Sequence, residues 1–95
     1  MGKMPKLNQQ EIVDQLSGIP AWQLNGEEIV RLFQFKNFVE SMRFVNKVAE
    51  LAEVAQHHPD IQINWNKVTL SLTTHDSGGL TQNDFDLAEQ IDELS

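Results

Sequence analysis

The residues of this chain best suited to acid and base chemistry are its three histidines. His57 and His58 are adjacent, and His75 follows at the far end of a strand-like stretch. An imidazole has an unperturbed pKa of about 6.5, so it can both donate and accept a proton at neutral pH. A cluster of imidazoles therefore indicates general acid and base catalysis.

The segment between the adjacent histidines and His75 has the pattern of a β-hairpin. Apolar and polar residues alternate from Ile61 to Trp65 and again from Val68 to Leu72, which is the period of two typical of half-buried strands. If Asn66-Lys67 is a two-residue turn, Trp65 faces Val68 and Ile61 faces Leu72. The same register sets His58 opposite His75, with their Cβ atoms about 4.5 to 5.5 Å apart. We therefore predict that the imidazoles meet at the open end of this hairpin.

Several candidate residues also have a purely structural explanation. A histidine such as His57 at the C-terminus of a helix stabilises the helix dipole by about 0.3 to 1 kcal/mol. Asp84 stands at the third position of a helix that opens at Thr81, where a carboxylate completes a capping box. Trp22 and Trp65 could stack on a flat heterocycle, but core packing is the commoner role of an indole on an apolar strand face. Both explanations stay open for these residues.

A mononuclear metal site is the alternative use of the histidine cluster. Adjacent side chains diverge on most backbones, and helical metal ligands usually stand at positions i and i+4, so the His57-His58 spacing disfavours such a site. The sequence has no cysteine, which excludes thiolate nucleophiles, disulfides and cysteine-bound metals within this chain. Gly78-Gly79 lacks the lysine of a phosphate-binding loop. We therefore expect neither a metal nor another cofactor.

Length and charge limit the class of protein. Ninety-five residues correspond to one domain. The net charge is −7, and every charged residue after Lys67 is acidic, which disfavours direct binding of nucleic acid or of an anionic membrane surface. No apolar run approaches the roughly 18 residues of a membrane span, and the N-terminus lacks the apolar core of a signal peptide. We expect a cytoplasmic protein.

Capping and turn signals predict the elements that position these residues. They are a short helix after Asn8, a hairpin around Asn25-Gly26, a helix over 36–56, a hairpin over 61–72 and a last helix after Thr81. The first turn pairs Trp22 with Ile29. This order predicts an α+β fold, a single-domain two-layer sandwich with a four-stranded antiparallel sheet and helices on one face. We expect the domain to span 1–95, with 1–7 flexible.

The helix predicted over 36–56 carries two apolar stripes at helical spacing. The first stripe is Phe38, Met42, Val45, Ala49 and Ala52, and the second is Phe44, Val48, Leu51 and Ala55. We assign the first stripe to the core and the second to a partner subunit, because a monomer seldom exposes a contiguous apolar patch. A homodimer or homotetramer is therefore expected. The alternative is one helix with a single broad buried face.

These segments together resemble the pterin-4a-carbinolamine dehydratases, also called the dimerisation-cofactor family. The resemblance rests on 52–59, which ends in His57-His58-Pro59, on Trp65 to Val68, on Leu72 to Asp76, and on Gly79-Leu80-Thr81 before Asp84. It continues upstream through Gly18-Ile19-Pro20, Trp22 and 33–38, so it covers nearly the whole chain after about the first seven residues. It implies that His57, His58 and His75 line a pterin site. It also implies that Trp22, Pro59 and Asp84 lie in or near that site, with substrate contacts from Gln56 to His58 and from Thr73, Thr74 and Asp76.

The implied reaction is loss of water from 4a-hydroxytetrahydropterin in tetrahydrobiopterin recycling, with a small pterin as substrate. One imidazole would protonate the leaving hydroxyl and another would take a ring-nitrogen proton, which needs no redox cofactor or metal. We expect His58 and His75 to be this pair and His57 to bind and polarise the substrate. Asp76 departs from the glutamate of many relatives. The alternative function is a protein-interaction, or dimerisation, cofactor that acts through its helical surface.

Overall fold

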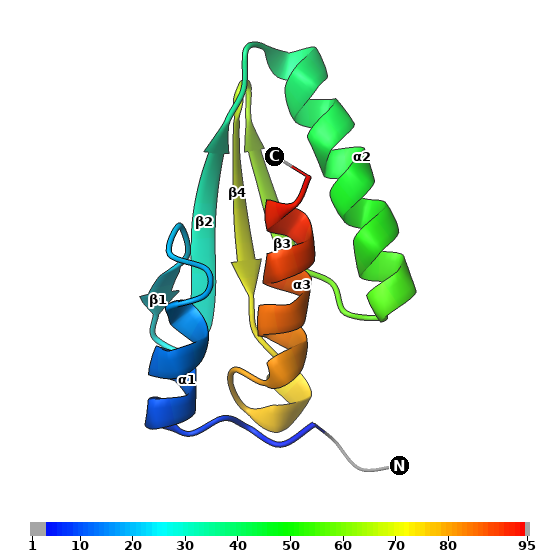
Figure 1. Ribbon diagram of the computed structural model, residues 1–95. Coiled ribbons are helices and arrows are strands. Elements are labelled where there is room, and N and C mark those ends of the chain that lie inside the picture. The colour runs from blue at the N-terminus through cyan, green and yellow to red at the C-terminus, as the bar shows by residue number, and fades with distance from the viewer. Residues whose placement is uncertain (1–3, 95) are drawn as a thin grey trace.

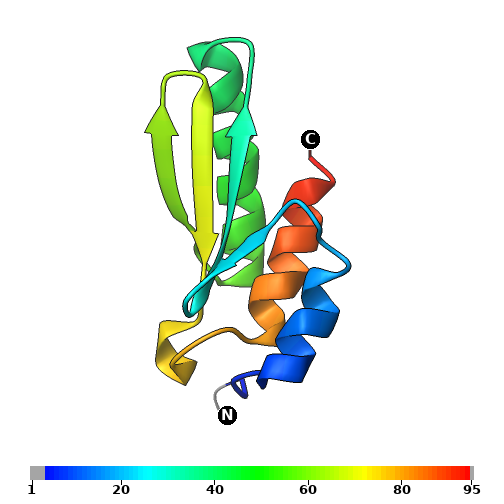
Figure 2. The same ribbon diagram turned by 90° about the vertical axis from the view of Figure 1, so that its left-hand side faces the viewer.

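The computed structural model describes residues 4–94, in which helices pack against a single four-stranded antiparallel sheet. In chain order the elements are α1 (Gln9–Leu16), β1 (Gln23–Asn25), β2 (Glu28–Gln34), α2 (Phe38–Ala55), β3 (Asp60–Asn64), β4 (Lys67–Leu72), the short 3-10 helix η1 (His75–Ser77) and α3 (Gln82–Asp92). Figure 1 shows α2 and α3 along one face of the sheet, and Figure 2 shows α1 beside α3. The predicted α+β sandwich and its element order are confirmed.

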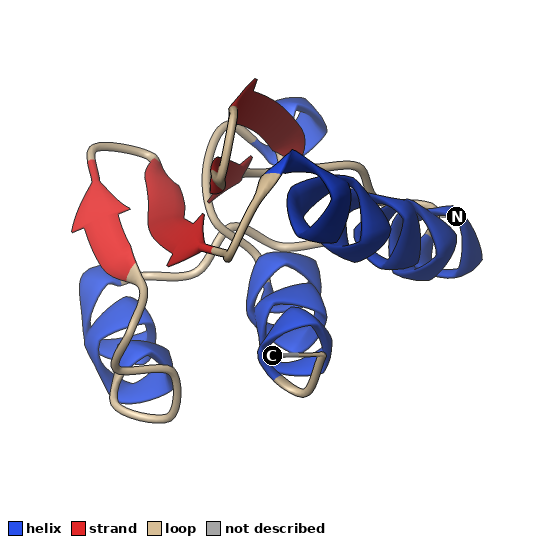
Figure 3. Ribbon diagram, turned by 90° about the horizontal axis from the view of Figure 1, so that it is seen from above, coloured by secondary structure: helices blue, strands red, loops and turns tan. Residues whose placement is uncertain are grey.

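The strand order is β1-β2-β4-β3, so β4 lies inside the sheet and β3 forms one edge. One face of the sheet is apolar and buried at Ile29, Phe33, Val68, Leu70 and Leu72. Seen from above, α3 lies between α1 and α2 (Figure 3). Within residues 4–94, no helix is long and apolar enough to cross a membrane.

The predicted register of the second hairpin is wrong by two residues. The structure pairs Ile61 with Leu70 and Ile63 with Val68, and Trp65 and Asn66 form the turn. Asn66 is held there because its carbonyl accepts the Phe35 N–H at 2.7 Å and its side-chain amide donates to the Phe35 carbonyl at 3.1 Å. A shift of two leaves every side chain on its original face, so the apolar alternation could not reveal it.

Two expectations change with this register. Continued past its last pair, the hairpin sets His58 opposite Thr73, so the predicted direct facing of His58 and His75 across the strands is not formed. Trp65 is not a core residue, because it occupies the turn with a φ of 53° and is 62% exposed.

The first hairpin is also shifted by two residues from its prediction. Leu24 rather than Trp22 pairs with Ile29, and the last pair, Asn25 with Glu28, encloses Gly26 and Glu27 in the turn. Gly26 adopts a φ of 65°, a left-handed conformation that glycine reaches without steric cost.

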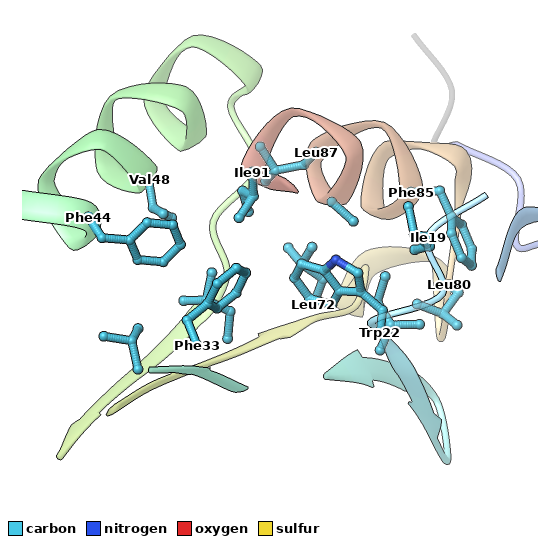
Figure 4. Packing of buried hydrophobic residues seen from close by; sticks show 14 residues of the cluster. Ile19, Trp22, Phe33, Phe44, Val48, Leu72, Leu80, Phe85, Leu87 and Ile91 are labelled. Carbon is cyan, nitrogen blue, oxygen red and sulfur yellow. The ribbon is translucent and has the colours of Figure 1, made fainter. Parts of the chain in front are cut away.

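The buried face of α2 differs from the predicted one. Phe44 and Val48, which we assigned to a partner subunit, are 5% and 0% exposed and face the core, whereas Phe38 of the other stripe is 48% exposed. Figure 4 shows Phe44 and Val48 directed toward Phe33 of the sheet and Ile91 of α3. The Phe44 ring centroid lies 4.6 Å from that of Phe33. This aromatic contact orients the helix, and helical spacing alone does not specify it.

The helix caps follow the sequence signals. Asn8 and Glu11 form the reciprocal capping box of α1, and Thr81 and Asp84 form that of α3. The segment before α1 was expected to be flexible. Residues 1–3 lie outside the described part, whereas the Leu7 N–H donates to the Leu80 carbonyl at 2.8 Å.

Candidate functional site

A hollow of about 240 Å³ brings the three histidines together. We call it the histidine hollow, and its lining residues are Gln56, His57, His58, Thr73, Thr74, His75 and Asp76. These residues come from the connection between α2 and β3 and from the connection between β4 and α3. Convergence of the imidazoles was predicted, although through a register that the structure does not have.

The end of α2 directs the adjacent histidines away from the helix. Gln56 adopts the left-handed conformation with φ 52° and ψ 40°, and its N–H bonds to carbonyls of the last helical turn. The His57 N–H then donates to the Ala52 carbonyl at 3.1 Å. This Schellman-like ending reverses the chain, so His57 and His58 line the hollow instead of continuing the helical surface.

His57 is held by a buried carboxylate. Its Nε2 lies 2.5 Å from Asp84 Oδ1, and the side chains are 13% and 0% exposed. Asp84 Oδ2 accepts from Thr74 Oγ1 at 2.8 Å and from the Thr81 N–H at 2.9 Å. A carboxylate accepts hydrogen bonds, so His57 donates through Nε2 and keeps Nδ1 for a ligand. The carboxylate thus fixes both the ring orientation and the tautomer of His57.

His58 has a different environment. Its Nε2 lies 2.5 Å from Glu53 Oε2, and the two side chains are 60% and 72% exposed. Such an exposed pair contributes little to stability. Because Glu53 contacts Nε2, Nδ1 is the ring nitrogen of His58 that is left for a ligand.

His75 carries the least constrained imidazole of the three. It lines the histidine hollow from η1 and is exposed. Within residues 4–94 its ring makes no hydrogen bond or ion pair. Both of its ring nitrogens can therefore exchange protons with a ligand or with water.

Three residues implied by the family resemblance do not line the hollow. Trp22 is 3% exposed in the core, where its Nε1–H donates to Asp92 Oδ1 at 2.8 Å. Pro59 is partly buried just before β3. Asp84 lies behind His57, so the same carboxylate serves both the capping box and the site.

Sequence reasoning missed two residues that support the site. Glu53 contacts His58 from the last turn of α2. Thr81 Oγ1 lies 2.9 Å from Thr74 Oγ1, next to Asp84. The spacing of Glu53 from the histidines is a usable signal for the first contact, whereas the second depends on the approach of two loops. In the described part of the chain, no group of three or more histidine and carboxylate side chains is arranged to hold a metal ion.

Comparison with known proteins gives a family match over nearly the whole chain. The family described as Pterin 4 alpha carbinolamine dehydratase matches residues 5–94. A relative from Picosynechococcus sp. named "Putative pterin-4-alpha-carbinolamine dehydratase" is 57% identical over 94% of this chain and 97% of its own. A relative of the same name from Acidobacterium capsulatum is 55% identical over 96% of this chain and 99% of its own.

Two solved structures are similar in fold. One is described as a transcriptional coactivator/pterin dehydratase from Brucella melitensis. It has a TM-score of 0.89 and 32% identity, and the match covers 94% of this chain and 97% of that one. The other is a pterin dehydratase-like protein described as a RuBisCO assembly factor in the alpha-carboxysome. It has a TM-score of 0.63 and 22% identity, with 77% and 84% of the chains covered, and it supports the fold alone. With the match over residues 5–94 and these identities, the chain belongs to the pterin 4 alpha carbinolamine dehydratase family.

Proposed function

We propose that this protein is a dehydratase that converts 4a-hydroxytetrahydropterin to quinonoid dihydropterin and water, in tetrahydrobiopterin recycling. The observation that carries the proposal is the convergence of His57, His58 and His75 in one hollow. Family membership supports the same substrate class.

The reaction balances with two imidazoles. The C4a–O bond breaks as the N5 lone pair forms a double bond to C4a. A protonated imidazole gives its proton to the departing hydroxyl, which leaves as water, and a neutral imidazole takes a proton from a ring nitrogen of the pterin. Positioned groups of this kind accelerate proton transfers by about 10² to 10⁴-fold.

The surroundings of the imidazoles support different roles for them. We assign proton transfer to His58 and His75, which are exposed to the hollow. The assignment rests on the hollow that both residues line. It does not rest on the strand register, in which they do not face one another. His57, fixed by Asp84, binds and polarises the substrate. Substrate contacts at or beside the hollow are proposed for Gln56, Pro59, Thr73, Thr74 and Asp76. Asp84 is proposed to support the site by holding His57, and Trp22 by packing in the core.

The test is turnover of 4a-hydroxytetrahydropterin by the purified protein in the presence of EDTA. We expect its loss to be faster than in buffer alone. A rate equal to that of buffer would rule out the dehydratase, whereas activity abolished by the chelator would favour a metal site.

Self-association is the second part of the proposal. The surface proposed for it differs from the stripe expected from the sequence, because Phe44 and Val48 of that stripe are buried. Apolar side chains stay exposed along α2 at Phe38, Val39 and Val54, with 48%, 56% and 87% exposure. At the edge strand β3, Ile61 and Ile63 are each 37% exposed. An edge strand with apolar side chains invites pairing or coverage by another chain. A homodimer or homotetramer that covers these residues is therefore proposed.

A role as an interaction cofactor is the second candidate function. It is favoured by the description of the Brucella melitensis structure as both coactivator and dehydratase and by the exposure of Val54. The two roles separate by mutation. Substitution of the histidines should abolish turnover only, and substitution of Val54 should weaken assembly only.

A further inference from the structure

The loop that carries His75 and Asp76 is closed at its base. The Thr74 N–H donates to the Gly79 carbonyl at 3.1 Å, and the Gly79 N–H donates back to the Thr74 carbonyl at 3.3 Å. Between them η1 makes a single turn that ends at Gly78, whose φ is 77°. Among residues 4–94 the His75 ring has no hydrogen bond or ion pair, so the backbone of this loop determines where the ring lies.

The segment before α1 attaches to this loop from outside. We call residues 4–7 the N-terminal strap. Ser77 Oγ donates to the Met4 carbonyl at 2.5 Å, and the Leu7 N–H donates to the Leu80 carbonyl at 2.8 Å. Figure 1 shows the strap running beneath the turn that joins β4 to α3.

The turn between β1 and β2 completes the attachment. Thr73 Oγ1 donates to the Glu27 carbonyl at 2.6 Å, and the Glu27 carboxylate pairs with Lys6 Nζ at 3.3 Å. This ion pair lies against the buried backbone of Gly79, because a Cβ at that position would overlap Glu27 Oε2 and lie 2.8 Å from Lys6 Cε. The glycine lets the pair approach the loop.

We propose that the N-terminal strap, together with Glu27, is a positioning element that holds the His75 loop at the histidine hollow. None of Met4, Lys6, Glu27 and Ser77 lines the hollow, so their effect on the reaction passes through the loop. The inference rests on the proposed dehydratase activity. A displacement of about 1 Å of a reacting group can cost about 100-fold in rate, so loosening one attachment should cost a smaller factor.

The test uses two variants that loosen the loop in different ways. Ser77→Ala removes the bond to Met4, and Gly79→Ala wedges a methyl group against the Lys6–Glu27 pair, whose side-chain ends can swing into solvent. We expect each to lower kcat by roughly threefold to tenfold with KM nearly unchanged. Ser77→Thr, which keeps the donor, should restore kcat. Ser17→Ala is the matched control, because it removes a similar hydroxyl bond, to the Asp14 carbonyl, at the end of α1.

A second measurement does not depend on turnover. In NMR spectra the Cε1–Hε1 signal of His75 should shift in Ser77→Ala and Gly79→Ala, while the signals of His57 and His58 stay in place. An unmoved His75 signal, or kcat within twofold of wild type in both variants, would overturn the proposal. An inactive wild type would refute the proposed function alone, and a shifted His75 signal would then still support the hold of the strap on the loop.

Discussion

At the scale of single residues, the buried Asp84 links folding to chemistry. Its two oxygens have different partners, since Oδ1 contacts His57 and Oδ2 accepts the Thr81 N–H of the helix cap. A capping residue needs only to accept a hydrogen bond, whereas a carboxylate that fixes a tautomer must accept at a second atom as well. The two roles therefore respond differently to substitution.

We expect Asp84→Asn to lower kcat by about 10² or more while the protein still folds. The amide oxygen can still accept from Thr81, but the amide N–H₂ would donate to His57 and move the imidazole proton to Nδ1. Nitrogen NMR of His57 should report the exchanged tautomer. Asp86→Asn is the control, because Asp86 is exposed and, among the described residues, its carboxylate accepts a single bond, from Gln82 on the same helix. An unchanged kcat and an unchanged His57 spectrum would contradict this role for Asp84.

The exposed imidazoles make a separate prediction. His58→Ala and His75→Ala should each lower kcat by about 10² or more. Because residues that act as a unit are not additive, the double variant should lose less than the product of the two single losses. The measurement is kcat for the four proteins under one set of conditions. Fully multiplicative losses would mean that the two imidazoles act independently.

At the scale of elements, the sequence predicts where helices and strands form. It does not predict the strand register or the buried face of a helix where two arrangements fit the same apolar pattern. Strands, helices and caps follow from periodicity and from Asn8, Asn25-Gly26 and Thr81. Both hairpins are shifted by two residues, which preserves the alternation. The same ambiguity affects α2, where both stripes have helical spacing and the contact between Phe44 and Phe33 determines which is buried. The histidines of the hollow were predictable, and the sequence spacing of Glu53 from them could have indicated its contact with His58, whereas the contact between Thr74 and Thr81 depends on how two loops approach each other.

The shifted turn strains Trp65. A residue with a side chain loses about 1 kcal/mol or more in the left-handed conformation that Trp65 adopts, with its φ of 53°. We therefore expect Trp65→Gly to raise the free energy of unfolding above that of Trp65→Ala, which removes the same indole but keeps the Cβ. Urea denaturation at one low protein concentration measures the difference. Equal stability of the two variants would show that the turn carries no such strain.

At the scale of the whole molecule, the chain leaves apolar side chains exposed along α2. Val48 is fully buried in the core, whereas Val54 of the same helix is 87% exposed. A core position and a proposed assembly position thus lie on one helix and can be substituted separately.

Val54→Glu should shift the protein toward the monomer in sedimentation while leaving its far-ultraviolet spectrum intact. Val48→Glu should instead unfold it, because an unpaired charge would be buried in the core. Val13→Glu is the matched control, since Val13 is 55% exposed on α1. A wild type that is monomeric at tens of micromolar, or a Val54→Glu protein that assembles normally, would rule out this surface.

The two tryptophans give the molecule two optical probes. The sequence has no tyrosine, so the near-ultraviolet emission of the protein comes chiefly from Trp22 and Trp65. Trp22 is 3% exposed and hydrogen-bonded to Asp92, whereas Trp65 is 62% exposed. A buried indole emits at shorter wavelength than one in water. A variant that keeps Trp22 alone should report unfolding of the core, and a variant that keeps Trp65 alone should report whatever comes to cover the β3–β4 turn.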